Sequence, residues 1–213
     1  MKHYILIVMA LLLCASTYAQ EEKKPVIISE VPQYMIAHGI RLDFDKKLNK
    51  KNQWFVGGIQ IFLDENELQE NGYYNTSQFY KTMIGYGIQG YHKYLFGNDP
   101  VTQGPYLAYG GTFQNYFFKY PTKGWNSYKE NDLEYITQEQ YLMRQTIYKF
   151  GAELLFGFQF HVFQNIITDV YLGCGLRYSL YQYPDRKRFN ENMLHFGYTG
   201  IMPVTGVRIG LVL

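Results

Sequence analysis

Hydrophobic residues recur at every second position over most of the chain, which is the period of a β-strand with two different faces. The clearest segment is 148–161, where Phe150 and Phe158 share one face while Lys149 and Glu153 share the other. The pattern predicts an all-β chain. The same alternation occurs in six further segments, at 36–44, 54–63, 84–93, 106–114, 169–178 and 207–213.

The connections between these segments alternate in length. Short turns alternating with long loops are typical of an up-and-down barrel in an outer membrane. Seven strands would leave the two chain ends on opposite sides, so we expect an eighth strand at 25–31. The fold class is then an eight-stranded antiparallel up-and-down transmembrane β-barrel with three long external loops, and Asn131 starts a helical turn in the middle loop. The short links are 46–51, 96–103 and 163–168, and the long polar ones are 64–81, 119–143 and 184–197.

The two faces of the strands differ in more than hydropathy. In a soluble sandwich or lipocalin-like barrel the apolar face points inward, whereas in an outer-membrane barrel it meets lipid. Small residues are unnecessary on a solvated face, but a narrow interior needs them beside Arg and Tyr. The face rich in glycine and charge is therefore expected to be the inside. Eleven glycines lie on that face, at positions 39, 58, 85, 87, 110, 151, 157, 173, 175, 206 and 210.

Aromatic residues cluster near both sets of connections, as expected for rings that lie at the two membrane interfaces. The aromatic residues near the short turns are Tyr91, Tyr94, Phe96, Tyr106, Phe160 and Phe163. Those near the long loops are Phe62, Phe79, Tyr80, Tyr116, Phe117, Phe118, Tyr120, Tyr178, Tyr181 and Tyr183. We therefore predict two aromatic belts. The alternative is that aromatic residues are simply common in strands.

Composition supports a folded β chain and excludes several other classes. Of 213 residues, 18% are aromatic and 18% are charged, against roughly 25% charged in an ordinary soluble domain. The aromatic content excludes disorder. A mean hydropathy of −0.26 excludes a bundle of membrane helices. A net charge of +2 gives no reason to expect nucleic acid, and two Cys cannot form a disulfide framework.

The first 19 residues have the organisation of a secretory signal peptide. Lys2 supplies the positive region, Ile5 to Leu13 supply a short apolar stretch, and Ala19 ends a small-residue cleavage site. Nine apolar residues are too few to span a bilayer. We therefore expect a signal peptide at 1–19 and one outer-membrane barrel domain at 20–213.

Three stretches of the chain carry a resemblance to a known group. They are Gly104-Pro105-Tyr106-Leu107-Ala108-Tyr109-Gly110, Asp169-Val170-Tyr171-Leu172-Gly173-Cys174-Gly175-Leu176-Arg177, and the alternating end from Val207 to Leu213. With them the chain resembles the small eight-stranded outer-membrane barrels of Gram-negative bacteria, in the OmpA/OmpX/OmpW-like group. The likeness is one of pattern and covers nearly all of 34–213. It implies a location in the bacterial outer membrane.

The charged residues expected inside the barrel are the main candidate site. Unpaired charges in a narrow lumen are costly, so we expect these to pair across strands and form a structural network that closes the lumen. A narrow pore is the alternative. In the last long loop, Arg186, Lys187 and Arg188 could contact lipopolysaccharide phosphates or a protein partner, or be a solvated hairpin tip. The predicted lumen charges are Arg41, Asp43, Lys93, Lys149, Glu153, Asp169, Arg177 and Arg208.

Enzyme chemistry finds little support in the sequence. The histidines show no metal-ligand spacing, so no metal or cofactor is expected. Ser179, Glu153 and His161 lie on neighbouring strands, but Ser179 is expected near the external end and His161 near the periplasmic end. We therefore expect a non-enzymatic protein with a structural or adhesive role that its external loops perform, in contact with outer-membrane lipid and lipopolysaccharide. The alternatives are a lipid-modifying enzyme, a small pore and a secreted lipocalin-like binder.

Overall fold

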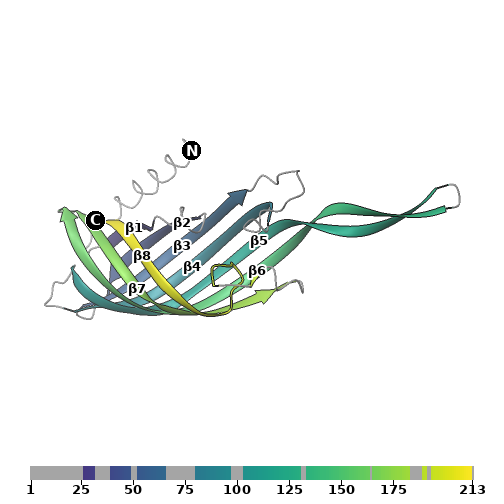
Figure 1. Ribbon diagram of the computed structural model, residues 1–213. Helices are drawn as coiled ribbons and strands as arrows, with labels where there is room; N and C mark the ends of the chain where they lie inside the picture. Colours follow the sequence, from purple (N-terminus) through teal and green to yellow (C-terminus); the bar gives the residue numbers. More distant parts are fainter. Residues whose placement is uncertain are drawn as a thin grey trace.

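The computed structural model describes residues 26–31, 39–48, 52–65, 80–96, 103–130, 133–163, 165–182, 189–190 and 193–212. Eight β-strands make up almost all of this part (Figure 1). No helix in these ranges has the length and apolar character needed to cross a membrane. The strands are β1 Val26–Val31, β2 Gly39–Lys47, β3 Gln53–Glu65, β4 Thr82–Leu95, β5 Gly104–Glu130, β6 Leu133–Phe163, β7 Ile166–Tyr181 and β8 Gly200–Val212.

Each strand pairs antiparallel with its neighbours in the sequence, and β1 pairs with β8 to close the barrel. The closing register places Ile28 opposite Leu211 and Ser29 opposite Gly210. Closure leaves no free sheet edge in the barrel wall, which a membrane-spanning sheet requires because lipid cannot hydrogen-bond to the backbone. The predicted eight-stranded antiparallel up-and-down barrel is therefore confirmed, including its weakly patterned first strand.

The connections divide between the two ends of the barrel. At one end, which we call the turn end, the links are short, at 48–52, 96–103 and 164–165. The first of these ends on Asn52 in the left-handed region (φ 61°), which closes the turn before β3. At the opposite end, the hairpin end, the links are 32–38, 66–81, 131–132 and 182–199. The predicted short turns therefore have the correct positions.

The middle long loop was wrongly predicted. Residues 119–130 and 133–143 form the ends of β5 and β6, which project beyond the barrel as a long ribbon (Figure 1). Above the Lys119–Arg144 pair the two strands continue to pair with each other up to Glu130 and Leu133. We call this ribbon the β5–β6 hairpin, comprising residues 120–130 and 133–143. The predicted helical turn from Asn131 is also wrong, because Leu133 and the residues after it are strand.

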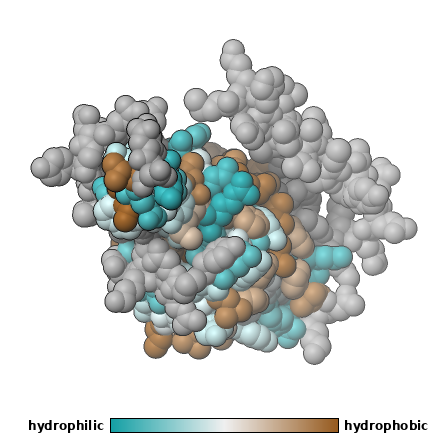
Figure 2. Space-filling view, turned by 90° about the vertical axis from the view of Figure 1, so that its right-hand side faces the viewer, coloured by the Kyte–Doolittle hydropathy of each residue, from teal (hydrophilic) through white to brown (hydrophobic). Residues whose placement is uncertain are grey.

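Side chains alternate strictly between the outside and the inside of the barrel wall. On β4, Ile84 and Ile88 are more than half exposed, whereas Gln89 and Lys93, at positions of the opposite parity, are buried. The same alternation runs along β6, where Phe150 is exposed and Lys149 is buried. Viewed from the hairpin end, hydrophobic residues lie around the periphery of the barrel (Figure 2). The molecule therefore has an apolar exterior and a polar interior, the reverse of a soluble barrel.

Candidate functional site

The interior near the turn end holds a dense group of ion pairs. Arg208 contacts Asp169 and lies 3.3 Å from Asp45, and Lys93 lies 3.0 Å from Asp169 and 3.3 Å from Asp45. Arg41 binds Asp43 through two nitrogens, at 2.8 and 2.6 Å. All six side chains are at most 6% exposed. We call this group the charged layer: Arg41, Asp43, Asp45, Lys93, Asp169 and Arg208.

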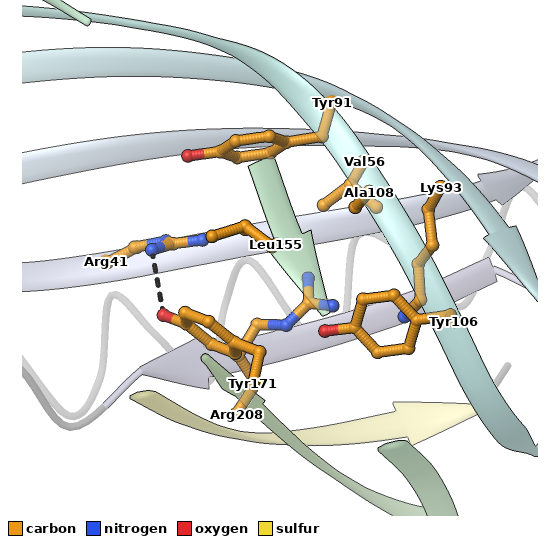
Figure 3. Close-up of a pocket in the computed structure, with 9 residues that line it drawn as sticks. All are labelled: Arg41, Val56, Tyr91, Lys93, Tyr106, Ala108, Leu155, Tyr171 and Arg208. Carbon is orange, nitrogen blue, oxygen red and sulfur yellow. Dashed lines mark hydrogen bonds between the residues drawn. The ribbon is translucent and has the colours of Figure 1, made fainter. Parts of the chain in front are cut away.

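Tyrosines complete the hydrogen bonding around these charges. The Tyr106 hydroxyl donates to Asp169 at 2.6 Å, and Arg41 donates to the Tyr171 hydroxyl at 3.4 Å (Figure 3). The Lys93 ammonium also lies 4.2 Å from the centre of the Tyr106 ring, within cation–π range. Figure 3 shows these side chains converging from different strands on a cavity of only about 10 Å³, room for about one water molecule.

Glycine on the neighbouring strand makes room for each ring. Tyr106 lies directly opposite Gly157, Tyr171 opposite Gly206, and Tyr91 opposite Gly110. A Cβ added at any of these three glycines would lie less than 3 Å from the facing ring and would collide with it. The segregation of glycine to the inner face thus has a direct steric cause. Each ring occupies the space that its partner's missing side chain leaves.

A second ion pair lies on the β6 and β7 side of the interior. Arg177 contacts Glu153 and donates to the Thr112 hydroxyl at 3.1 Å, while the Tyr91 hydroxyl donates to Glu153 at 2.7 Å. Lys149 is the exception among the predicted charges. It is 7% exposed, yet it forms no ion pair with any residue in the described ranges.

Three glutamines connect the charged layer to the opposite end of the lumen. Gln89 donates to Asp43 at 2.7 Å, Gln60 donates to Gln89 at 3.2 Å, and Gln114 donates to Gln60 at 2.7 Å. The Tyr116 hydroxyl then donates to Gln114 at 2.9 Å. Each amide uses its NH₂ group toward the charged layer and its oxygen toward the hairpin end. This chain of donors satisfies polar groups that water would otherwise have to satisfy.

Toward the hairpin end the lumen is filled with rings. Phe118 lies at the centre of the group, 4.8 Å from Phe189 and 5.4 Å from Phe196 between ring centroids. These two rings come from the β7–β8 connection, which Tyr181 holds by donating to the Gly197 carbonyl, so it folds back over the lumen. We call this group the aromatic layer: Phe62, Tyr80, Met83, Tyr116, Phe118, Tyr120, Ile147 and Phe189, with Met143, Tyr181 and Phe196 packed against them.

The aromatic layer corrects the predicted belts. The buried rings on β3, β4 and β5 were predicted to lie at the membrane interfaces. They occupy inner-face positions, however, and so cannot meet lipid. Phe117 and Tyr178, in contrast, are exposed on the outside, as are Tyr94, Phe96, Phe160 and Phe163 at the turn end. Phe79 and Tyr183 lie outside the described residues. The rings wrongly assigned to the interfaces are Phe62, Tyr80, Tyr91, Tyr106, Tyr116, Phe118 and Tyr120, each buried in the lumen.

Sequence reasoning missed Asp45 and the tyrosines of the charged layer. Asp45 fell between the predicted strand, which ended at Phe44, and the predicted link, which began at Lys46. In the structure β2 continues to Lys47 and directs Asp45 inward. Tyr91 lies two residues from Lys93 and Tyr106 lies two residues from Ala108, so each tyrosine shares the inner face with that neighbour. This spacing could have predicted their inward position. The basic residues Arg186, Lys187 and Arg188 lie outside the described residues.

The residues considered for an enzyme do not meet. Ser179 lies opposite Lys149, whereas His161 lies opposite Ile167 at the turn end. Twelve residues of β6 separate those two registers, or about 40 Å along the strand. Ser179 instead donates to the Tyr198 carbonyl at 3.2 Å, and Glu153 binds Arg177 and Tyr91. In the described ranges, no three His, Cys, Asp or Glu side chains form a group suited to a metal ion.

A closed eight-stranded antiparallel wall, apolar outside and charged inside, defines an integral β-barrel of the outer-membrane type. Two solved structures are similar to this chain. One is Acinetobacter baumannii CarO, with 12% identity, coverage of 90% of this chain and 98% of that chain, and a TM-score of 0.44. The other is Neisserial surface protein A (NspA), with 9% identity, coverage of 89% and 92%, and a TM-score of 0.42. No protein-family model and no curated protein matches the chain.

Proposed function

We propose that the protein resides in the bacterial outer membrane, that its lumen is closed to solutes, and that its β5–β6 hairpin contacts partners outside the cell. The observation that carries this proposal is the contrast between a filled lumen and a projecting ribbon. The cavity between the charged side chains has a volume of about 10 Å³, too small for a continuous water column. The interaction surface is therefore sought on the hairpin.

The hairpin has the composition of a binding element. Trp125 is 74% exposed and Ile136 is 68% exposed, and the Tyr128 and Tyr135 rings stack 5.4 Å apart. Exposed aromatic residues are enriched at protein interfaces. Both edges of the ribbon also lack a neighbouring strand among the described residues. A partner can bind to such an edge by adding a strand of its own. A protein partner bound along one edge would contact both the exposed aromatic side chains and the backbone of the edge strand.

Location and topology are tested together on intact cells. The chain is expected in the detergent-extracted membrane fraction, with gel migration that changes on heating. A protease added outside intact cells is expected to cut within 120–143 and to leave the barrel strands intact. Recovery of the protein without detergent would instead support a secreted binder and contradict the proposal.

Closure of the lumen is tested by conductance. The purified chain in a planar bilayer is expected to give no discrete openings, because ion pairs and rings fill the lumen from the turn end to the hairpin end. Regular openings with a defined conductance would contradict closure and support the small pore. A loss of membrane lipid modification on Ser179→Ala or His161→Ala would support an enzyme, and no such loss is expected.

A further inference from the structure

The outer surface at the hairpin end is organised in rows that cross β4, β5 and β6. The register places Thr82, Lys119 and Arg144 side by side in one row. The next row toward the membrane centre contains Ile84, Phe117 and Thr146. Together these two rows line a groove of about 470 Å³ in the outer surface, where the β5–β6 hairpin leaves the barrel. The groove thus has two cations in its upper row, above Ile84 and Phe117 in its lower row.

The two cations of the upper row lack compensation. Lys119 and Arg144 are direct cross-strand partners on the same face, and both are exposed. Neither forms an ion pair with a residue that the structure describes. Like charges directly opposite one another destabilise a strand pair. An anion between them would remove that repulsion and accept charge-assisted hydrogen bonds from both. None of the described residues that line the groove is acidic.

The rows below establish where the groove lies relative to lipid. Beneath Ile84 and Phe117 comes a row of Tyr86, Asn115 and Tyr148, in which Asn115 donates to the Tyr86 hydroxyl at 3.2 Å. The following row, Ile88, Phe113 and Phe150, is entirely apolar. From the membrane centre outward, the apolar row is followed by the row with Tyr86 and Tyr148, then by the row with Ile84 and Phe117, and the cations come last. Tyrosine rings near the end of an apolar wall and cations beyond them are typical of a membrane interface. Lys119 and Arg144 therefore lie at the level of lipid headgroups.

We propose that Lys119 and Arg144 bind a phosphate group of lipid A in the outer leaflet, with its acyl chains against Ile84 and Phe117. The inference rests on the proposed outer-membrane location. Charge complementarity selects the phosphate, and the adjoining apolar row selects a phosphate attached to hydrocarbon over a soluble one. Arg is suited to a bidentate contact and Lys to a point contact with such a group. The basic triplet at 186–188 is not needed for this site.

The test measures lipid retention by native mass spectrometry of the full mature chain in detergent, after mixing with diphosphoryl lipid A. The double variant Lys119→Gln/Arg144→Gln is expected to retain at least about tenfold less lipid A than the wild type, since two charge-assisted contacts are lost. The matched control Lys123→Gln/Lys129→Gln removes two exposed cations from the adjoining β5–β6 hairpin and is expected to bind like the wild type. Lys119→Arg is expected to preserve binding.

Three results would overturn the inference. They are equal retention by the Lys119→Gln/Arg144→Gln variant, equal retention of fully dephosphorylated lipid A by the wild type, and complete displacement of lipid A by inorganic phosphate. The last result would assign the site to a soluble anion. Heat-dependent gel migration is measured on every variant, and its presence shows that the barrel is folded. A wild-type chain that fails to associate with membranes contradicts the proposed function itself, which separates that failure from failure of this site.

Discussion

The charged layer and the aromatic layer lie in the same lumen, but different interactions hold them together. The charged layer is built from strand residues alone, and each carboxylate has a specific cationic partner, as Asp169 has in Lys93 and Arg208. The aromatic layer is built from rings in loose mutual orientations, with centroid separations of 4.8 to 6.0 Å. It also takes Phe189 and Phe196 from a connection. The charged layer depends on the strand register, which brings each charge to its partner, and the aromatic layer depends on the volume that its rings fill.

This difference teaches which changes each layer can tolerate. A buried ion pair contributes little net stability, but removing one partner leaves the other charge buried without compensation. Ring packing has no such partner requirement, and a lost ring costs transfer free energy plus the energy of the residual cavity. A single substitution in the charged layer is therefore expected to lower the free energy of unfolding strongly. In the aromatic layer the loss of this free energy is expected to grow with the side-chain volume removed. The predictions below test that distinction in order of expected size.

The largest effect is expected for Asp169→Asn. The substitution keeps the shape of the side chain but leaves Lys93 and Arg208 with Asp45 as the one carboxylate that both still contact among the described residues. We expect the free energy of unfolding to fall by about 3–5 kcal/mol, measured by urea titration in lipid vesicles with gel migration as the readout. The control Glu134→Gln, on the exposed hairpin, is expected to change it by less than about 0.5 kcal/mol. A small loss for Asp169→Asn would show that the pairing is not required.

Phe189→Ala tests the aromatic layer. Phe189 is buried against Phe118 and Tyr120, but it lies on a connection that can partly collapse into the space left by the ring. A loss of about 3 kcal/mol is therefore expected, at the lower end of the range for Phe-to-Ala substitution. The variant is also expected to give no conductance in planar bilayers, because the charged layer still fills the turn end. Discrete openings would show that the aromatic layer alone closes the lumen.

Gly157→Ala tests the space that glycine leaves for Tyr106. The added Cβ would displace the ring, and with it the hydroxyl that donates to Asp169. We expect a loss of about 1–3 kcal/mol, the usual range for inserting volume into a packed interior. The matched control is Gly111→Ala, on the lipid-facing side of β5, where the nearest atom to the added carbon is 3.4 Å away. Equal losses for the two substitutions would contradict the steric account.

The smallest effect is expected for Lys149→Met. Lys149 has no ionic partner in the described ranges, so its removal leaves no stranded charge and spares a buried ammonium group. The free energy of unfolding is expected to change by less than about 1 kcal/mol, or to rise. Lys93→Met is the comparison, since it leaves two carboxylates short of a cation, and it is expected to lose about 3–5 kcal/mol. Similar losses for the two lysines would contradict the assigned difference between them.

The alternation of residues predicted seven of the eight strands and the inward face because a narrow lumen and surrounding lipid demand opposite residues. The eighth strand followed from the need to bring both chain ends to the same side. The alternation gave no prediction of strands in the β5–β6 hairpin, where both faces of the ribbon meet water. Above Lys119 the ribbon has no apolar face to mark it, so 119–143 was predicted as a loop. The alternation was also set aside for Tyr91 and Tyr106. They were assigned to an aromatic belt because they lie near short turns, although their positions in the alternation place them on the inner face. The pairing of Arg208 with Asp169 and Asp45 required the register, which single-strand patterns do not contain.

The most direct test of the inside-out arrangement uses Cys174. Its thiol is free and exposed near the middle of β7, on the same face as Leu172 and Leu176. A spin label there, in the chain reconstituted into lipid vesicles, is measured for collisions with oxygen, which partitions into lipid, and with a water-soluble nickel complex. Trp125→Cys in a Cys174→Ala background is the water-exposed control. At Cys174 oxygen is expected to dominate and at position 125 the nickel complex, whereas equal access of nickel to both positions would contradict a lipid-facing exterior.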